Sequence, residues 1–227
     1  MAKLIVTIDG PAASGKSTAA RLLAEKLGAS FLDTGAMYRA VTFAAMQAGV
    51  DMSNEEQLLV VMDKGEFQFT VHEGRMLVSI DGNDVTEQIR DQQVTANARY
   101  IASAPKVRER LVRMQRQFAA GQNKIVTEGR DQGTVAFADA NIKFFLTADP
   151  DERARRRQVE LDNKTGGNSL DEIRNAIEQR DKSDRDRAVG PLKPAADAIV
   201  VDTTDLNIEQ VVDKLLGFVR EKCLKNG

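Results

Sequence analysis

A chain of 227 residues with 42% hydrophobic and 29% charged side chains has the composition of a folded globular protein, which excludes a mainly disordered one. The net charge of −2 disfavours a nucleic-acid-binding protein, because such proteins are usually basic. The single cysteine, Cys223, cannot form an internal disulfide, no apolar run approaches the ~18 residues of a membrane span, and the first residues lack signal-peptide architecture. A cytoplasmic protein is expected.

The first part of the chain alternates short apolar strands with helices. The run LIVTI at 4–8 is rich in β-branched residues and predicts a buried strand of a parallel sheet. A glycine-rich loop follows, and a helix with apolar residues at helical spacing then ends at Gly28. We further expect a strand at 31–32, a helix from Asp33 to about Gln47, and a helix capped by Ser53 and Glu56 that ends near Gly65.

Residues 66–80 show a different pattern. Apolar and polar residues alternate at 66–71 and at 75–80, and His72-Glu73-Gly74 lies between these runs, which predicts an antiparallel hairpin. A second turn is expected at 81–84. A hairpin between helices indicates a lobe inserted at about 65–90. His72, the only histidine, lies in the predicted turn and is not expected to be catalytic.

The second half of the chain returns to alternation. The expected elements are two helices separated at Pro105, strands at 124–127, 142–146 and 198–201, a helix starting at 149–152, a polar loop at 163–168, a helix from Ser169 to about Arg187, and a closing helix at 208–219. The predicted fold class is α/β: a five-stranded parallel sheet flanked by helices, with an inserted antiparallel hairpin lobe.

The first loop matches G-x-x-x-x-G-K-[ST], the phosphate-binding loop of P-loop NTPases. Glycines let backbone N–H groups surround an anion, and the following helix adds its positive end. The lysine can reach the β and γ phosphates of a nucleotide, and the serine hydroxyl can bind Mg²⁺. The residues expected to hold ATP are Gly10, Pro11, Ala12, Ala13, Ser14, Gly15, Lys16, Ser17 and Thr18.

A carboxylate ends the third predicted core strand. Glu128 stands where a carboxylate beside a phosphate loop usually holds Mg²⁺ through water, although a surface acid at a strand end remains the alternative. Gly129 is expected to leave room for a ligand, and Arg130 and Asp131 are expected to point over the carboxyl edge of the sheet.

Arginines are concentrated in one stretch, since 14 of the 19 lie between Arg99 and Arg187. Arg153, Arg156 and Arg157 are spaced to share one face of a helix, and Arg180, Asp184 and Arg187 share a face of the next helix. Two such helices around the loop at 163–168 indicate a helical lid that closes over phosphates. The alternative is an exposed helical hairpin with local ion pairs.

Seven segments together resemble the bacterial cytidylate kinases of the nucleoside monophosphate kinase superfamily. They are VTIDGPAASGKST (6–18), LDTGAMYRA (32–40), PKVRERL (105–111), EGRDQGTVAFADA (128–140), ERARRR (152–157), RDKSDRDR (180–187) and PLKPAADAIVVDTT (191–204). The resemblance implies a P-loop kinase that transfers the γ-phosphate of ATP to CMP or dCMP with Mg²⁺, in pyrimidine nucleotide metabolism. It also implies a monophosphate-binding region at 34–120, a lid at 150–187 and a monomer that binds neither nucleic acid nor membranes.

The matching positions imply a role for each site residue. Arg39 and Arg130 hold the acceptor phosphate; Thr34, Arg108, Asp131 and Arg187 face the cytosine; Arg180 and Asp184 reach the sugar; Arg153 and Arg157 are lid arginines near the ATP phosphates; and Lys16 and Arg130 complete the catalytic set. A carboxylate with arginines complements cytosine, which offers an amino donor beside acceptor atoms.

Two departures from the family pattern and three competing functions remain. The family often has Ser where this chain has Thr34, and commonly has Ser at the position of Arg99, where it contacts the sugar.

A shikimate or adenylate kinase is the nearest alternative enzyme, but the hairpin insert and the EGRD and RDKSDRDR segments argue against it. A nucleotide-binding switch or a nucleic-acid-dependent ATPase is disfavoured because the chain has no N-K-x-D segment and is short for a motor.

Overall fold

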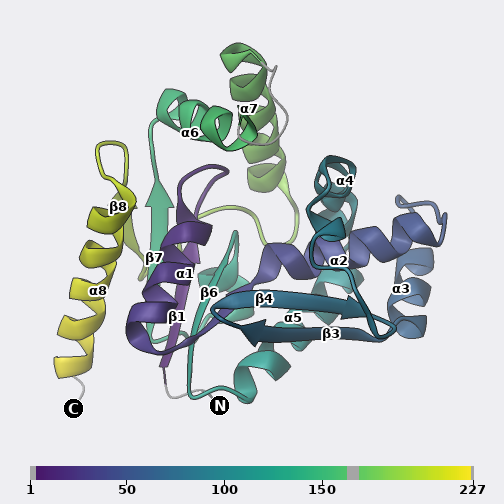
Figure 1. Cartoon of the computed structure of the whole chain (residues 1–227), viewed down its shortest axis with the longest axis horizontal. Helices are drawn as coiled ribbons and strands as arrows, with labels where there is room; N and C mark the ends of the chain where they lie inside the picture. The colour runs from purple at the N-terminus through teal and green to yellow at the C-terminus, as the bar shows by residue number, and fades with distance from the viewer. Residues whose placement is uncertain (1–3, 163–168, 226–227) are drawn as a thin grey trace.

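The computed structural model describes residues 4–162 and 169–225. Its centre is a five-stranded parallel sheet in the order β2–β6–β1–β7–β8. Because the strands are parallel, their carboxyl ends meet at one edge, which lies at the top of Figure 1 below α6 and α7. The predicted fold class is confirmed. The strands are β1 (Leu4–Asp9), β2 (Ser30–Asp33), β6 (Lys124–Gly129), β7 (Ile142–Thr147) and β8 (Ile199–Asp202).

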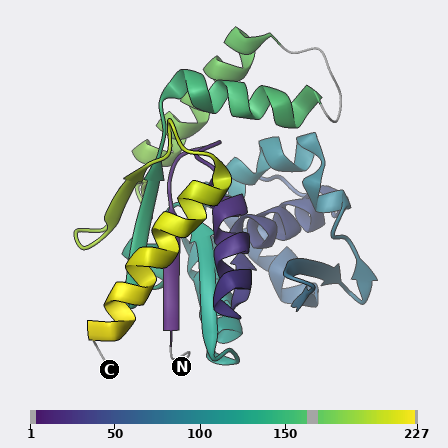
Figure 2. The same cartoon turned by 60° about the vertical axis from the view of Figure 1, so that its left-hand side comes forward.

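Helices cover both faces of this sheet, which explains why β1 and β6 are buried along nearly their whole length. On one face, α1 (Lys16–Leu27) and α8 (Ile208–Lys225) pack side by side against β1 and β7, as Figure 2 shows. On the other face, α2 (Thr34–Gln47) and α5 (Pro105–Ala120) form a second core with α3 (Glu55–Lys64) and α4 (Gln92–Ser103).

The start of α3 corrects one expected cap. Asn54, not Ser53, is the N-cap, and its side chain accepts hydrogen bonds from the backbone N–H groups of Glu56 and Gln57. The Ser53 hydroxyl instead donates to Asp51 at 2.7 Å. Serine and asparagine both favour the N-cap position, so the spacing of Ser53 and Glu56 was not decisive.

The inserted lobe is a small antiparallel sheet of β3 (Phe67–His72), β4 (Arg75–Ile80) and β5 (Asn83–Asp84). Alternate residues of the hairpin face the second core, among them Phe69, Met76 and Val78. The hairpin prediction is therefore confirmed. The predicted second turn at 81–84 is shorter in the structure. Residues 83–84 are not part of a turn but form a third strand, which pairs with Ile80 and Ser79.

Above the carboxyl edge of the main sheet lie α6 (Pro150–Asp162) and α7 (Leu170–Asp186), which we call the cover. A small apolar cluster of Ala154, Ile173 and Ile177 packs α6 and α7 together and against Ala12. The predicted hinge loop at 163–168 lies outside the described residues, and the division into a region at 34–120 and a lid at 150–187 stays a prediction. Within 4–162 and 169–225, no helix combines the length and apolar character needed to cross a membrane.

Candidate functional site

The loop between β1 and α1 depends on two glycines, at positions where a residue with a side chain would be strained or would collide with its surroundings. Gly10 is in close contact with β7, so a Cβ there would collide with the carbonyl oxygen of Leu146. Gly15 has a φ of 83° at the N-cap of α1. The loop therefore wraps the positive end of α1, as the motif predicts, and Ser17 and Thr18 lie exposed in its first turn.

Lys16 is buried behind this loop. Its residue is 6% exposed, and its Nζ donates to the carbonyl of Pro11 at 3.0 Å. Burial, together with the nearby Arg130, lowers the pKa of Lys16 to about 7, although Glu128 opposes the change. An ammonium group destabilised in this way is stabilised by any anion that enters the loop.

The cover is anchored on the phosphate loop. Asp181 of α7 accepts a hydrogen bond from the backbone N–H of Ala12 at 2.9 Å and forms a buried ion pair with Arg153 of α6. Arg153 also donates to the carbonyls of Ala12, at 3.1 Å, and Ala148, at 3.2 Å. Sequence reasoning missed Asp181, because the contact joins residues 169 positions apart. In this structure Arg153 connects the cover to the loop, and its contact with ATP stays a prediction.

Buried carboxylates end three adjacent strands: Asp9 on β1, Asp33 on β2 and Glu128 on β6. Asp33 caps α2 by accepting from Ala36 at 2.8 Å, and it also accepts from the Arg39 guanidinium at 3.3 Å. Glu128 makes no side-chain hydrogen bond or ion pair with any described residue, so its carboxylate is available to a ligand. Only Glu128 was selected from the sequence, although Asp9 and Asp33 also follow apolar strand residues directly and could have been found from the same pattern.

The surroundings of Thr34 and Gly129, both near Glu128, differ from those that the sequence predicted. The Thr34 hydroxyl donates to the backbone carbonyl of Glu128 at 2.7 Å. Gly129 does not leave open space: a Cβ there would lie 2.8 Å from Gln132 Cγ and 3.0 Å from the Thr34 hydroxyl. The glycine therefore accommodates neighbouring side chains of the protein itself.

Asp131 and Arg108 form a buried ion pair beyond the end of β6. Asp131 is 4% exposed and Arg108 is 2% exposed. Burial raises the pKa of Asp131, although Arg108 and Arg187 oppose the change. The Arg108 guanidinium lies 5.6 Å from the centre of the Tyr38 ring, and Gly190 lies so close to the pair that a Cβ would collide with both side chains.

A second set of charges joins the strand edge to α7. Arg130 Nε donates to Asp184 at 2.7 Å, and Arg187 Nη2 lies 3.7 Å from the other carboxylate oxygen. Burial alone would raise the pKa of Asp184, but Arg130 and Arg187 outweigh it and the pKa is lowered. Asp184 is thus the point at which the cover meets Arg130.

Arg180 and Arg157 remain more open. Arg180 is exposed and forms no ion pair with the described residues. Desolvation, together with the nearby Arg130, lowers its pKa to about 10. Arg157 pairs with Glu160 at 2.8 Å on the surface of α6. Neither side chain forms a hydrogen bond or ion pair with the described residues of the phosphate loop, and the roles of both stay predictions.

Several buried donors of the site have no hydrogen-bond partner among the residues that the structure describes. Buried polar groups are normally paired, so each exception calls for an acceptor. Three of these donors belong to residues predicted to bind CMP, and one belongs to the phosphate loop: Arg39 Nε, Arg108 Nε, Arg187 Nη2 and Ser14 Oγ.

Comparison with known proteins agrees with this geometry. The family model described as Cytidylate kinase matches residues 6–221. The chain belongs to the cytidylate kinase family. A cytidylate kinase from Rhodopirellula baltica is 49% identical over 96% of this chain and 93% of its own length, and one from Bacillus thuringiensis is 45% identical over 96% of each. A gluconokinase from Sinorhizobium meliloti, 13% identical over 97% of this chain and 94% of its own, has a TM-score of 0.51 and shows the same fold.

In this member of the cytidylate kinase family, Arg156 was expected to share a helix face with Arg153 and Arg157. Its side chain instead contacts the segment that follows β8. Arg156 donates to the Thr203 hydroxyl at 3.0 Å and to the Thr204 carbonyl at 3.3 Å. The Thr203 hydroxyl lies within donating distance of two carbonyls, that of Thr147 at 3.0 Å and that of Ser14 at 3.3 Å. Arg156 thus ties α6 to the segment after β8 and, through it, to the phosphate loop.

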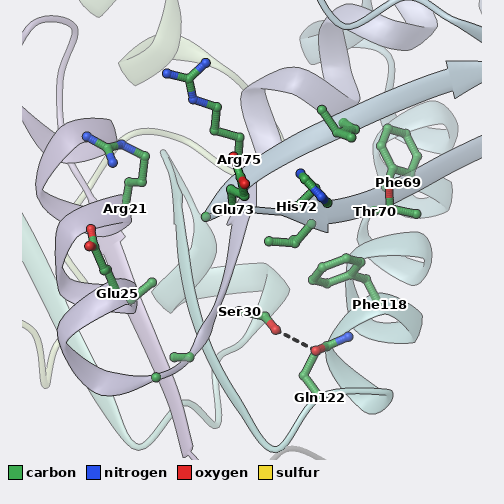
Figure 3. Close-up of a pocket in the computed structure, with 16 residues that line it drawn as sticks. Arg21, Glu25, Ser30, Phe69, Thr70, His72, Glu73, Arg75, Phe118 and Gln122 are labelled. Atoms are coloured by element: carbon green, nitrogen blue, oxygen red, sulfur yellow. Dashed lines mark hydrogen bonds between the residues drawn. The ribbon is translucent and has the colours of Figure 1, made fainter.

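A groove of about 1240 Å³ lies apart from these residues, between α1 and the hairpin. Figure 3 shows Arg21 and Glu25 on the α1 side and Phe69, His72 and Arg75 on the hairpin side. None of the predicted catalytic or binding residues lines this groove.

Arg99, the position at which the family commonly has Ser, lies exposed on α4 and stacks on Tyr100 at 5.0 Å from the ring centre. Its guanidinium also donates to the Tyr100 hydroxyl at 3.3 Å. In this structure Arg99 is engaged with its neighbour on the same helix.

Proposed function

We propose that this chain transfers the γ-phosphate of ATP directly to CMP and dCMP, which produces ADP with CDP or dCDP. Membership of the cytidylate kinase family supports the reaction. The observation that carries the placement of the acceptor is the set of buried arginine N–H groups, on Arg39, Arg108 and Arg187, that donate no hydrogen bond to any described residue. Arg108 pairs with Asp131 and Arg187 lies beside Asp184, the two carboxylates that would accept from the cytosine amino group and the sugar hydroxyls.

The ATP phosphates would lie on residues 10–18. Backbone N–H groups of the loop and the amino end of α1 face the anion, and Lys16 gains its full charge when phosphate oxygens replace its bond to Pro11. The lid arginines Arg153 and Arg157 would add positive charge from the cover. Phosphoryl transfer needs no side-chain nucleophile, so the work of these residues is to position groups and to stabilise charge.

The residues around the loop fit Mg²⁺. The Ser17 hydroxyl is exposed in the first turn of α1, and the Glu128 carboxylate has no protein partner among the described residues. Both offer hard oxygen atoms of the kind that Mg²⁺ prefers: Ser17 would hold the ion directly and Glu128 would hold it through water. When bound, the ion neutralises charge on the phosphate oxygens. Within 4–162 and 169–225, no group of three or more His, Cys, Asp or Glu side chains is arranged to hold a metal.

The acceptor would lie between the strand edge and the cover. Arg39 and Arg130 would bind its phosphate, and Arg180 and Asp184 its sugar. Asp131 would accept from the cytosine amino group while Thr34, Arg108 and Arg187 complete the base contacts. A cytoplasmic monomer that binds neither nucleic acid nor membranes, acting in pyrimidine nucleotide metabolism, is part of the same proposal.

Coupled measurement of ADP release with a panel of acceptors tests this function. CMP and dCMP should give high kcat/KM, and UMP, AMP, GMP, shikimate and gluconate should give far less. Equal turnover of AMP or shikimate would contradict the proposed acceptor, and nucleic-acid-stimulated ATP hydrolysis without an acceptor would indicate an ATPase instead.

A further inference from the structure

Asp9, the last residue of β1, is a buried carboxylate that the proposed reaction does not use. Both of its oxygens accept hydrogen bonds from backbone groups: Oδ1 from Gln132 N at 2.9 Å, and Oδ2 from Gly133 N at 2.8 Å. The first contact spans 123 positions of sequence. The side-chain charges that act on Asp9 are those of Asp131 and Arg130, and no cation forms an ion pair with it among the described residues.

The two amides belong to the residues that directly follow Asp131. They begin the π-helical turn η2 (Gln132–Ala136), whose backbone closes when the Asp131 carbonyl accepts from Val135 at 2.8 Å and Ala136 at 3.2 Å. Such turns are rare and often lie at functional sites. The peptide after Asp131 is thus held by its own turn on one side and by β1 on the other.

We propose that Asp9 is a positioning residue for the acceptor nucleotide. By binding the amides of Gln132 and Gly133, it sets the direction in which Arg130 and Asp131 leave the end of β6. This inference rests on the CMP placement proposed above. If one of the two amides were released, the chain after Asp131 could rotate, which would move Arg130 and Asp131 away from the positions in which they meet the base and the acceptor phosphate.

The phosphate loop has its own supports, so the effect should be confined to the acceptor. Lys16 bonds to Pro11, and Asp181 holds Ala12, and neither contact involves η2. An asparagine at position 9 has nearly the same shape as aspartate and leaves the neighbouring Gly10 backbone unchanged. Binding of ATP should therefore be insensitive to this substitution.

The burial of Asp9 also argues for a functional role. Burial raises the pKa of this carboxyl to about 7, even though the hydrogen bonds from Gly133 and Gln132 lower it. A neutral side chain would avoid this desolvation penalty. Ionisable groups held in unfavourable surroundings are concentrated at functional sites.

Asp9→Asn is the direct test, because its amide NH₂ would face one of the two backbone N–H groups that an oxygen now accepts. We expect the KM for CMP to rise about tenfold or more while the KM for ATP stays within about twofold. Asp51→Asn is the matched control, since Asp51 accepts from the backbone and hydroxyl of Ser53 in an exposed turn. Equal increases in both KM values, or no increase for CMP, would overturn the inference.

Gly133→Ala perturbs the same contact without changing the charge of Asp9. A Cβ there would lie 3.0 Å from Thr7 Oγ1 and 3.4 Å from Asp9 Oδ2, so the Thr7 side chain or the start of η2 must move by a few tenths of an ångström. We expect the same selective increase in the KM for CMP, at about threefold or more. Gly217→Ala in α8 is its control, because no atom lies within 4 Å of the added Cβ. If Asp9→Asn does not fold, an unchanged KM for CMP in Gly133→Ala overturns the inference.

Asp131→Ala separates this inference from the proposed function. If Asp131→Ala does not affect CMP, the proposed placement of the base is wrong. If Asp131→Ala weakens CMP binding and Asp9→Asn does not, the placement holds and the positioning role of Asp9 is wrong.

Discussion

Arg108 beyond the strand edge and Arg155 in the cover each pair with a carboxylate, yet their surroundings differ greatly. The Arg108 side chain is 3% exposed and its partner Asp131 is 6% exposed, whereas the Arg155 side chain is 69% exposed. Arg155 and Arg157 pair with acids three positions away on their own helix, and Arg174 pairs with Glu178 on its own helix and with Asp151 of α6. The arginine-rich stretch therefore contains both buried arginines, at the proposed acceptor site, and a charged helical surface.

Buried and exposed ion pairs also differ in how much they contribute to stability. Removing one member of a buried pair typically costs about 3–5 kcal/mol, because the other charge is left without a partner. Exposed pairs contribute roughly 0–1 kcal/mol. We call the buried charged residues at the strand edge the floor; they are Asp9, Lys16, Asp33, Arg108, Glu128 and Asp131. The charges of the floor are buried, whereas Arg155 and Arg157 of the cover form exposed pairs. The buried pair of Arg153 and Asp181, which anchors the cover on the phosphate loop, is the exception.

The largest effect should come from Lys16 in the floor. Lys16→Ala removes the buried charge behind the phosphate loop and should lower kcat by about 10²–10³ or more, since a preorganised charge of this kind is worth that much. Steady-state ADP release at saturating CMP measures the loss. Lys26→Ala on the same helix is the control, because Lys26 forms an exposed pair with Asp213. A Lys16 variant with near-normal kcat would show that the loop does not hold the transferring phosphate.

Asp131 should give the next largest effect, and a selective one. Uracil has a carbonyl where cytosine has its amino group, so Asp131→Ala should lower kcat/KM for CMP about 10–100-fold more than for UMP. Comparing two acceptors within one variant removes any general loss caused by leaving Arg108 unpaired. Parallel losses for CMP and UMP would mean that Asp131 does not read the base.

Much of the fold could be predicted because its signals are local. The apolar run at 4–8, the phosphate-loop spacing and the Ser169–Glu172 capping box each lie within a few residues. Strand β5 has two residues, too few to show a period of two. The pairing of Asp131 with Arg108 under Gly190, and the anchoring of Arg153 on Asp181, join distant segments through burial. No periodicity records such contacts, so the residues could be named from the sequence but their partners could not.

Asp184 tests the junction between floor and cover, where the expected effect is smallest. It accepts from Arg130 at 2.7 Å, so Asp184→Ala would both free Arg130 and remove a possible acceptor for a sugar hydroxyl. We expect kcat/KM for CMP and dCMP to fall together, by about tenfold, because both carry the 3′-hydroxyl that this carboxylate would bind. A loss confined to CMP would indicate a contact with the 2′-hydroxyl instead, and dideoxy-CMP should be a poor acceptor for the unmutated enzyme only if the 3′ contact matters. Asp186→Ala, at the exposed end of α7, is the control. An Asp184 variant within about threefold of wild type on every acceptor would mean that Asp184 serves only as a surface charge, as exposed pairs do.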